Sequence, residues 1–351
     1  MIVAASHNVH RSTVDRILAT GNQNDGFSTK HRAGRPKKLT VEVEKQLEKT
    51  LEQHNFDMSF EELAADVGLH RTTVARHARQ RSWRTVRAQL KPRLTATQQA
   101  SRLAWAEKYK DCTWDAWVDV DEKNFHTIAA NRLLKVPPNA TAPTVEVQHK
   151  SHIPKVMVLS AIAKPNIKHK FNGKVGVWRV CEVVEAKRSS KHHQKGDLYK
   201  KDTTMDADKF FEMMIECVFP AIRDRMPWAR SVVVQVDNAS PHTGKHTIEK
   251  LNNTPTPENS RTQITVVCQP SQSPDTNAND LGFFHSLQKR VEKLRGHGSA
   301  FDVAGLVERI ETAWEKYPSQ QLKNIFQTKS QVLKQIKEHH GGNNFKLTHQ
   351  K

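Results

Sequence analysis

The stretch SVVVQVD, residues 231–237, predicts a short buried strand ending in a carboxylate, because four of its seven residues are valines. Further runs rich in apolar and β-branched residues lie on both sides of it, at 116–121, 155–163, 175–184 and 263–267. Helical periodicity is present over 206–225 and from Asn279 to about Leu294. Three strands followed by two alternations of strand and helix predict an α/β domain built on a mixed sheet.

Three aspartates fall at the ends of these predicted elements. Asp121 closes the first strand, Asp237 closes the fourth, and Asp280 opens the late helix. The ends of neighbouring strands and the start of a covering helix can converge on one cleft, where three carboxylates repel one another unless cations neutralise them. Oxygen ligands with open positions suit Mg²⁺ or Mn²⁺, and two such ions about 3.5–4 Å apart can promote an in-line phosphoryl displacement. Each aspartate taken alone is more typical of a helix cap or a surface charge.

Other polar residues near these positions compete for the same roles. Asp119 shares a strand face with Asp121, because side chains alternate with a period of two. Asp275 is more typical of a turn residue. Two alternatives stay open for His242, which either hydrogen-bonds near the metal ions or completes the strand end. Glu122 either supports the metal site or forms a salt bridge.

The chain is strongly basic. Its 351 residues include 55 Lys and Arg against 37 Asp and Glu, a formal charge of +18, and the first 110 residues hold 20 and 11 of these, a net +9. An excess of this size indicates a polyanionic partner, most often nucleic acid. No apolar run approaches the roughly 18–20 residues needed to cross a bilayer, and no signal-peptide pattern opens the chain, so we expect no membrane association. Four scattered cysteines without a Cys-x-x-Cys pair indicate free thiols rather than a disulfide framework or a zinc finger.

The basic N-terminal third contains an internal repeat. The strings HRSTVDR (10–16) and HRTTVAR (70–76) correspond, and the second follows a capping-box pattern of Ser59 and Glu62. A helix over 60–67, a turn at Gly68 and a helix from about Arg71 predict a helix-turn-helix, whereas the first copy lacks most of its upstream helix and is interpreted as truncated.

Thr and Arg side chains on the second helix of each copy suit groove entry and phosphate contact. The predicted DNA contacts in the two copies are Arg11, Thr13, Arg16, Arg71, Thr72, Thr73 and Arg76. The alternative is a pair of solvated helices. Between the copies lies KHRAGRPKK, residues 30–38, where Gly-Arg-Pro flanked by lysines suits the minor groove and adds Arg35, Lys37 and Lys38 to the predicted contacts. A solvated linker or a nuclear-import signal is the competing interpretation of this stretch.

The composition and motifs divide the chain into six predicted segments. They are a partial helix-turn-helix at 1–29, a basic linker at 30–40, a second helix-turn-helix at 41–90, a linker with a helix at 91–113, a catalytic domain at 114–300 and a C-terminal helical tail at 301–351.

Three ordered stretches resemble the signature blocks of mariner-like transposases: VDVDEKNF (118–125), VVVQVDNASPH (232–242) and QPSQSPDTNANDLGFFHSLQ (269–288). The resemblance is to the plant and related eukaryotic branch of the Tc/mariner superfamily, which has a triad of three aspartates, and the C-terminal GGNNFKLTHQK is also similar to that branch. By position, the resemblance assigns the catalytic and metal-binding roles to Asp121, Asp237 and Asp280. The 42 residues between Asp237 and Asp280 exceed the usual spacing, and we expect the polar loop at 252–261 to hold the extra length.

This resemblance implies an RNase H-like catalytic core with a mixed sheet, preceded by an all-α helix-turn-helix region. It also implies two Mg²⁺ ions, or Mn²⁺ in their place, and cut-and-paste transposition in the nucleus by a homodimer that binds terminal inverted repeats and target DNA. A rival hypothesis is a catalytically inactive or domesticated DNA-binding protein, which the truncated first helix-turn-helix favours and the three retained aspartates oppose. A second rival, an RNase H-like nuclease acting on other nucleic acids, is disfavoured by the paired helix-turn-helix arm.

Overall fold

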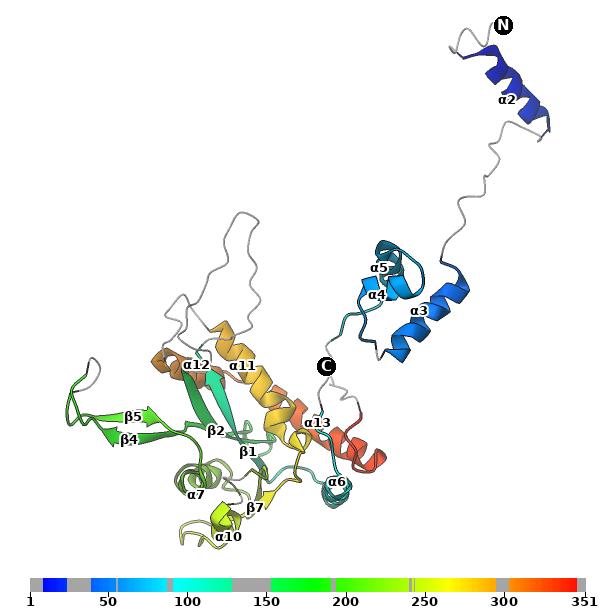
Figure 1. The fold of residues 1–351 in the computed structure, drawn as a ribbon. Helices are drawn as coiled ribbons and strands as arrows, with labels where there is room; N and C mark the ends of the chain where they lie inside the picture. The colour runs from blue at the N-terminus through cyan, green and yellow to red at the C-terminus, as the bar shows by residue number, and fades with distance from the viewer. Residues whose placement is uncertain are drawn as a thin grey trace. The chain divides into compact units, whose positions relative to one another are not determined.

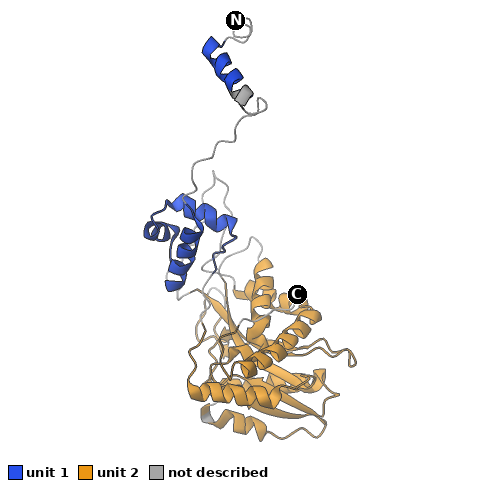
Figure 2. Cartoon of the chain, turned by 90° about the vertical axis from the view of Figure 1, so that its right-hand side faces the viewer, with its two compact units in different colours: residues 1–89 blue, residues 90–351 orange. Residues whose placement is uncertain are grey.

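A computed structural model describes residues 9–23, 39–54, 56–86, 91–127, 153–190, 194–239, 242, 244–294 and 303–345. These residues fall into two compact units, unit 1 within 1–89 and unit 2 within 90–351, which Figure 2 shows in different colours. Arg35, Lys37 and Lys38, the predicted minor-groove contacts, lie outside the described residues. Among the helices that the structure describes, none is long and apolar enough to span a bilayer.

Unit 1 is helical in its described part (Figure 1). Its helices are α2 (Arg11–Gln23), α3 (Val41–Gln53), α4 (Phe60–Asp66) and α5 (Arg71–Gln80). Leu47 of α3, Leu63 of α4 and Val74 of α5 are fully buried against one another and form a small core. This three-helix arrangement contains the predicted second helix-turn-helix.

The ends of α4 and α5 follow from local sequence. The Ser59 hydroxyl accepts a hydrogen bond from the Glu62 backbone N at 3.2 Å, and the Glu62 carboxylate accepts one from the Ser59 backbone N at 2.7 Å, so the predicted capping box is present. Gly68 makes the turn between the two helices with φ of 65°, a conformation open to glycine without steric cost. Helix α3 is not among the predicted elements, although Thr40 caps its first turn.

Unit 2 is built on a five-stranded sheet in the order β3-β2-β1-β6-β7. Its strands are β1 (Trp117–His126), β2 (Lys155–Ala163), β3 (Lys174–Arg179), β6 (Ser231–Val236) and β7 (Gln263–Cys268). The β1–β2 and β2–β3 pairs are antiparallel, whereas the β1–β6 and β6–β7 pairs are parallel. The predicted α/β class with a mixed sheet is therefore confirmed.

The prediction of a single strand over 175–184 is wrong. Strand β3 ends at Arg179, and β4 (Cys181–Glu185) pairs with β5 (Leu198–Asp202) in a separate two-stranded sheet. Val180, between β3 and β4, is buried and donates its backbone N–H to the Met157 carbonyl at 2.8 Å. A continuous run of β-branched residues does not reveal where a chain changes its pairing partner.

Helices cover both faces of the main sheet (Figure 1). One face carries α7 (Ala207–Met213), the π-helical turn η2 (Met214–Val218), α8 (Phe219–Arg225) and α10 (Thr247–Asn252). The other face carries α11 (Phe284–Lys293), α12 (Val303–Glu315) and α13 (Ser319–Glu338), with α6 (Ala96–Tyr109) packed on α13. Side chains of β1 alternate between the two cores: Val118 and Val120 belong to the first, Trp117 and Phe125 to the second.

The predicted helix from Asn279 to about Leu294 is confirmed. It begins as the π-helical turn η5 (Asn279–Phe283), continues as α11, and has Leu294 as its C-cap. A short 3₁₀ turn, η4 (Pro274–Thr276), precedes it, so Asp275 is the turn residue that the sequence predicts. This segment packs on β1 and α13, and it brings Asp280 close to Asp121. The prediction that Asp121 closes the first strand is wrong, because β1 continues through His126 in its pairing with β2 and Asp121 lies in its middle.

Candidate active site

The sheet places Asp121 and Asp237 side by side. The parallel pairing of β1 and β6 matches Asp119 with Gln235, and extending this register by two residues matches Asp121 with Asp237. Asp121 is 7% exposed, whereas Asp237, which directly follows β6, is half-buried. Asp280 approaches from η5, and Asp237 and Asp280 together line an open cleft of about 370 Å³ whose floor includes the loop at 269–274.

The three carboxylates lie close enough to alter one another's pKa. Burial raises the pKa of Asp121 well above its usual value, and the negative charges of Asp280, Glu122 and Asp237 raise it further. The pKa of Asp280 rises to about 6, first because the surrounding protein desolvates it and second because Asp237 repels it, while Lys123 and a hydrogen bond with Asp121 oppose the rise. The structure therefore brings the three predicted aspartates together in one cluster of mutually repelling groups.

His242 lies between Asp237 of this cluster and the neighbouring Glu122. Its Nε2 is 3.0 Å from the Glu122 carboxylate, while its Nδ1 contacts the Asp237 carboxylate and lies 3.2 Å from the Asp237 carbonyl oxygen. Burial alone lowers the pKa of His242, but the hydrogen bonds and charges of Asp237 and Glu122 outweigh burial and raise it to about 10. The single positive charge of the imidazolium ion therefore offsets part of the negative charge of Asp237 and Glu122. His242 thus hydrogen-bonds beside the aspartates, and Glu122 forms an ion pair with it.

The remaining donors fit a divalent cation by their chemistry. Among the described residues, no group of three or more His, Cys, Asp and Glu side chains already has the geometry of a metal site. Asp121 and Asp280 nevertheless present carboxylate oxygens whose mutual repulsion a cation would remove, and oxygen donors of this kind suit Mg²⁺ and Mn²⁺. Asp237, held by His242, supplies the third carboxylate at the cleft.

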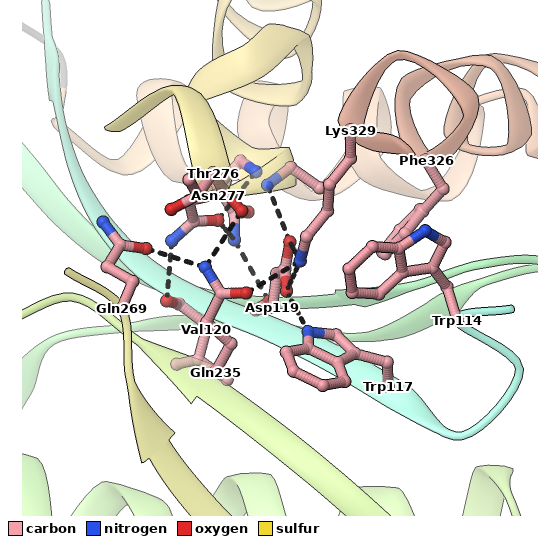
Figure 3. A network of polar contacts seen from close by, with 12 residues as sticks. Trp114, Trp117, Asp119, Val120, Gln235, Gln269, Thr276, Asn277, Phe326 and Lys329 are labelled. Atoms are coloured by element: carbon pink, nitrogen blue, oxygen red, sulfur yellow. Dashed lines mark hydrogen bonds and ion pairs between the residues drawn. The ribbon is translucent and has the colours of Figure 1, made fainter. Parts of the chain in front are cut away.

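Asp119, the neighbour of Asp121 on the same strand face, has a different partner. Lys329 of α13 reaches the sheet and donates to both carboxylate oxygens of Asp119, at 2.6 and 2.7 Å, with both residues fully buried (Figure 3). The indole N–H of Trp117 donates to the same carboxylate at 2.7 Å, and the Lys329 ammonium lies 4.4 Å from the ring centroid of Trp114. A fully paired buried charge of this kind has a structural role, so Asp119 does not compete with Asp121 for metal.

The same network holds the segment that leads to Asp280. The backbone N–H of Ala278 donates to the Asp119 carboxylate at 2.7 Å, and the Asn279 amide donates to the Asp119 carbonyl at 3.1 Å. Gln235 of β6 accepts from Lys329 at 2.8 Å and donates to the carbonyl of Thr276 at 3.0 Å (Figure 3). Strands β1 and β6, helix α13 and the η4–η5 segment therefore share one buried polar network directly behind the aspartate cluster.

Lys329 holds the network behind the aspartates together, but it is not among the site residues predicted from the sequence. It follows Leu322 by seven residues and precedes Ile336 by seven, so it lies in the buried apolar stripe of α13. An apolar helix stripe normally faces a core, so a lysine within it indicates a buried cation. This is the sequence signal that identifies Lys329.

The predicted DNA contacts of the two repeated helices have unequal exposure. Arg71, Thr72 and Arg76 are exposed on α5, Thr73 is half-buried, and Val74 between them packs into the core. Helix α2 likewise exposes Arg11 and Arg16 and half-buries Thr13. The exposed face of α5 is thus accessible to a groove. Among the described ion pairs, the acidic partners of α5 residues are Glu61, 3.8 Å from Arg71, and Glu44 of α3, 3.6 Å from the buried His77.

Solved structures provide the comparison with known proteins. No protein-family model and no curated protein matches the chain. The mariner Mos1 paired end complex with Mg is 16% identical, with 98% of this chain and 92% of that chain covered at a TM-score of 0.68. The Mos1 transposase paired-end complex with left transposon end (15%, 97% and 91%, 0.66) and the Mos1 strand transfer complex (14%, 98% and 96%, 0.63) are similar in the same way.

The chain has the fold of the Mos1 mariner transposase. The match extends over nearly all of both chains, so it includes the helical N-terminal region as well as the α/β unit. The predicted fold class, an RNase H-like core preceded by an all-α region, is confirmed by this match. The comparison is one of fold, and the chemistry follows from the residues of the site.

Proposed function

We propose that this chain is a mariner-like DNA transposase that binds terminal inverted repeats through unit 1 and cuts and joins DNA strands at Asp121, Asp237 and Asp280. The observation that carries the proposal is the gathering of these three carboxylates from β1, the end of β6 and η5, where burial first and the charges of neighbouring carboxylates second raise the pKa of Asp121 and Asp280. The fold shared with Mos1 transposase in its paired-end and strand-transfer complexes supports the same activity. By that analogy the working form is a homodimer, acting on transposon ends and target DNA in the nucleus.

In this proposal Asp121, Asp237 and Asp280 would hold two Mg²⁺ ions, or Mn²⁺ in their place. Such ions would supply activation of water or a DNA 3′-hydroxyl and stabilisation of the leaving oxygen. His242 keeps Asp237 ionised and oriented through its contact with the carboxylate. The buried pair of Lys329 and Asp119 holds η5 against β1, which fixes where Asp280 enters the cluster. The open cleft beside Asp237 and Asp280 gives the scissile phosphate access to the cluster from solvent.

Substitution of Asp237 by Asn tests the proposal. Asp237→Asn removes one anionic ligand and keeps the shape of the side chain, so we expect cleavage of DNA carrying the element's terminal repeats to fall by more than about 100-fold in Mg²⁺. Binding of the same DNA in a gel-shift assay should not change, because unit 1 is untouched. The matched control is Asp224→Asn, at an exposed aspartate of α8, which should cleave like the wild type.

Two results would contradict the proposal in different ways. Cleavage by Asp237→Asn at the wild-type rate would place the reaction elsewhere in the chain. A wild-type chain that binds its terminal repeats but does not cleave them in Mg²⁺ or Mn²⁺ would instead identify a DNA-binding protein without catalytic activity.

A further inference from the structure

Arg102 of α6 is completely buried and forms a bidentate ion pair with Asp275. Its Nη1 and Nη2 donate to the two carboxylate oxygens of Asp275, each at 2.7 Å, and its Nε donates to the carbonyl of Gly341 at 2.9 Å. All three guanidinium nitrogens therefore donate a hydrogen bond. Asp275 lies in η4, five residues before Asp280, so this pair connects helix α6 to the segment that carries the third aspartate of the cluster.

Between Asp275 and Asp280 the chain is held against β1 at successive residues. The amide of Asn277 donates to the Val120 carbonyl at 3.3 Å and to the Asp121 carboxylate at 3.4 Å. The backbone N–H of the next residue, Ala278, donates to the Asp119 carboxylate at 2.7 Å. Because the segment is short and hydrogen-bonded in this way, a shift of η4 is transmitted to Asn277 and Asp280, and both act directly on Asp121.

We propose that Arg102 is a positioning residue of the aspartate cluster: by holding Asp275 it sets the position of Asp280 relative to Asp121 and thereby the affinity of the cluster for a divalent cation. This inference rests on the proposed function, which assigns the cation to these aspartates. The planar guanidinium matches both carboxylate oxygens and fixes orientation as well as distance, which an ammonium group does not. Outer residues that orient metal ligands typically change metal affinity by 10–100-fold when they are removed.

The test measures Mn²⁺ binding to the full chain directly, by titration calorimetry without DNA. Asp275→Asn keeps the size of the side chain but removes the negative charge that pairs with Arg102. Arg102→Lys keeps the positive charge but removes the planar guanidinium that binds both carboxylate oxygens. We expect both variants to bind Mn²⁺ at least about 10-fold more weakly than the wild type. The matched control is Asp202→Asn, which breaks the equally two-pronged pair of Arg179 and Asp202 between β3 and β5 and should leave Mn²⁺ affinity unchanged.

A further variant separates positioning from folding. Replacing both partners by apolar residues, in Arg102→Met with Asp275→Leu, removes the buried charges together, and such replacements often retain stability. We expect this double variant to melt close to the wild type and still to bind Mn²⁺ more weakly. Wild-type Mn²⁺ affinity in the double variant, or in both single variants, would overturn the positioning role.

Asp280→Asn distinguishes this outcome from failure of the proposed function. If Asp280→Asn abolishes Mn²⁺ binding while Asp275→Asn binds like the wild type, the aspartate cluster holds the metal and only the role of Arg102 is wrong. If Mn²⁺ binding is the same in Asp280→Asn as in the wild type, or the wild type binds none, the metal site assigned to the cluster is wrong and the inference falls with it.

Discussion

At the scale of single residues, the carboxylates of Asp121 and Asp280 share a hydrogen bond and repel the nearby Asp237. A carboxyl group whose pKa is higher in the folded protein than in the unfolded chain contributes stability at low pH that is lost as pH rises through the folded-state pKa. For Asp280 this loss begins near the ordinary value of 3.8 and is complete above about 6. The metal-free protein is therefore destabilised at neutral pH by the same groups that the proposed function uses.

Asp280→Asn should accordingly stabilise the metal-free protein. Because Asp280 faces the cleft and water screens its charge, we expect a rise in Tm on the order of 2 °C at pH 7.5. The rise should shrink as the pH falls from about 6 to about 4, where Asp280 of the wild type is protonated in the folded state. Tryptophan fluorescence reports mainly on unit 2, which contains six of the seven tryptophans. A variant that is less stable than the wild type at pH 7.5 would show that the repulsion is unimportant.

At the scale of secondary-structure elements, the sequence predicts much of the sheet and the helix that begins at Asn279. Alternation and β-branched runs are local signals, so they identify β1, β2, β6 and β7 without knowledge of their neighbours. The switch from β3 to β4 after Arg179 and the helix α3 escape prediction, because each depends on packing or pairing with residues distant in sequence.

The candidate site shows the same division at residue level. Asp121, Asp237 and Asp280 can be picked out in the sequence because each ends or begins a predicted element, although β1 in fact continues past Asp121 to His126. The roles of Lys329 and Arg102 cannot be predicted in the same way, because their partners Asp119 and Asp275 lie 210 and 173 residues away in the chain.

Helix α13 contributes to the site mainly through Lys329. Lys329→Met would leave the Asp119 carboxylate buried without its cation, and we expect unit 2 to lose about 3–5 kcal/mol of unfolding free energy in urea denaturation. Adding Asp119→Asn, which removes the unpaired charge, should restore part of this loss. The control on the same helix is Lys334→Met, an exposed position where a change within about 0.5 kcal/mol is expected. Equal stabilities of Lys329→Met and Lys334→Met would refute the account of α13.

At the scale of the whole molecule, the basic charge is distributed unevenly. The first 110 residues carry a net +9 of the total +18. The other 241 residues also carry a net +9, and they contain the three aspartates of the cluster. DNA binding through unit 1 should therefore weaken steeply with salt, because each neutralised phosphate releases a condensed counterion.

Arg76→Ala should reduce the slope of log K against log salt for terminal-repeat DNA by about 1, the value for one phosphate contact. Arg76 is exposed on α5, so its removal leaves the core of unit 1 intact. Fluorescence anisotropy over a series of KCl concentrations measures the slope, with Arg225→Ala, at an exposed residue of unit 2, as the control. An unchanged slope for Arg76→Ala would remove this residue from the DNA contacts.

The buried pair of Lys329 and Asp119 also has a genetic consequence. A stop codon or frameshift between the Asp280 and Lys329 codons leaves all three aspartates of the cluster in the product, yet that product has Asp119 without its cation. The aspartate codons are thus an incomplete criterion for an intact gene copy. The open reading frame must also extend through Lys329, and through Gly341, whose carbonyl accepts from Arg102.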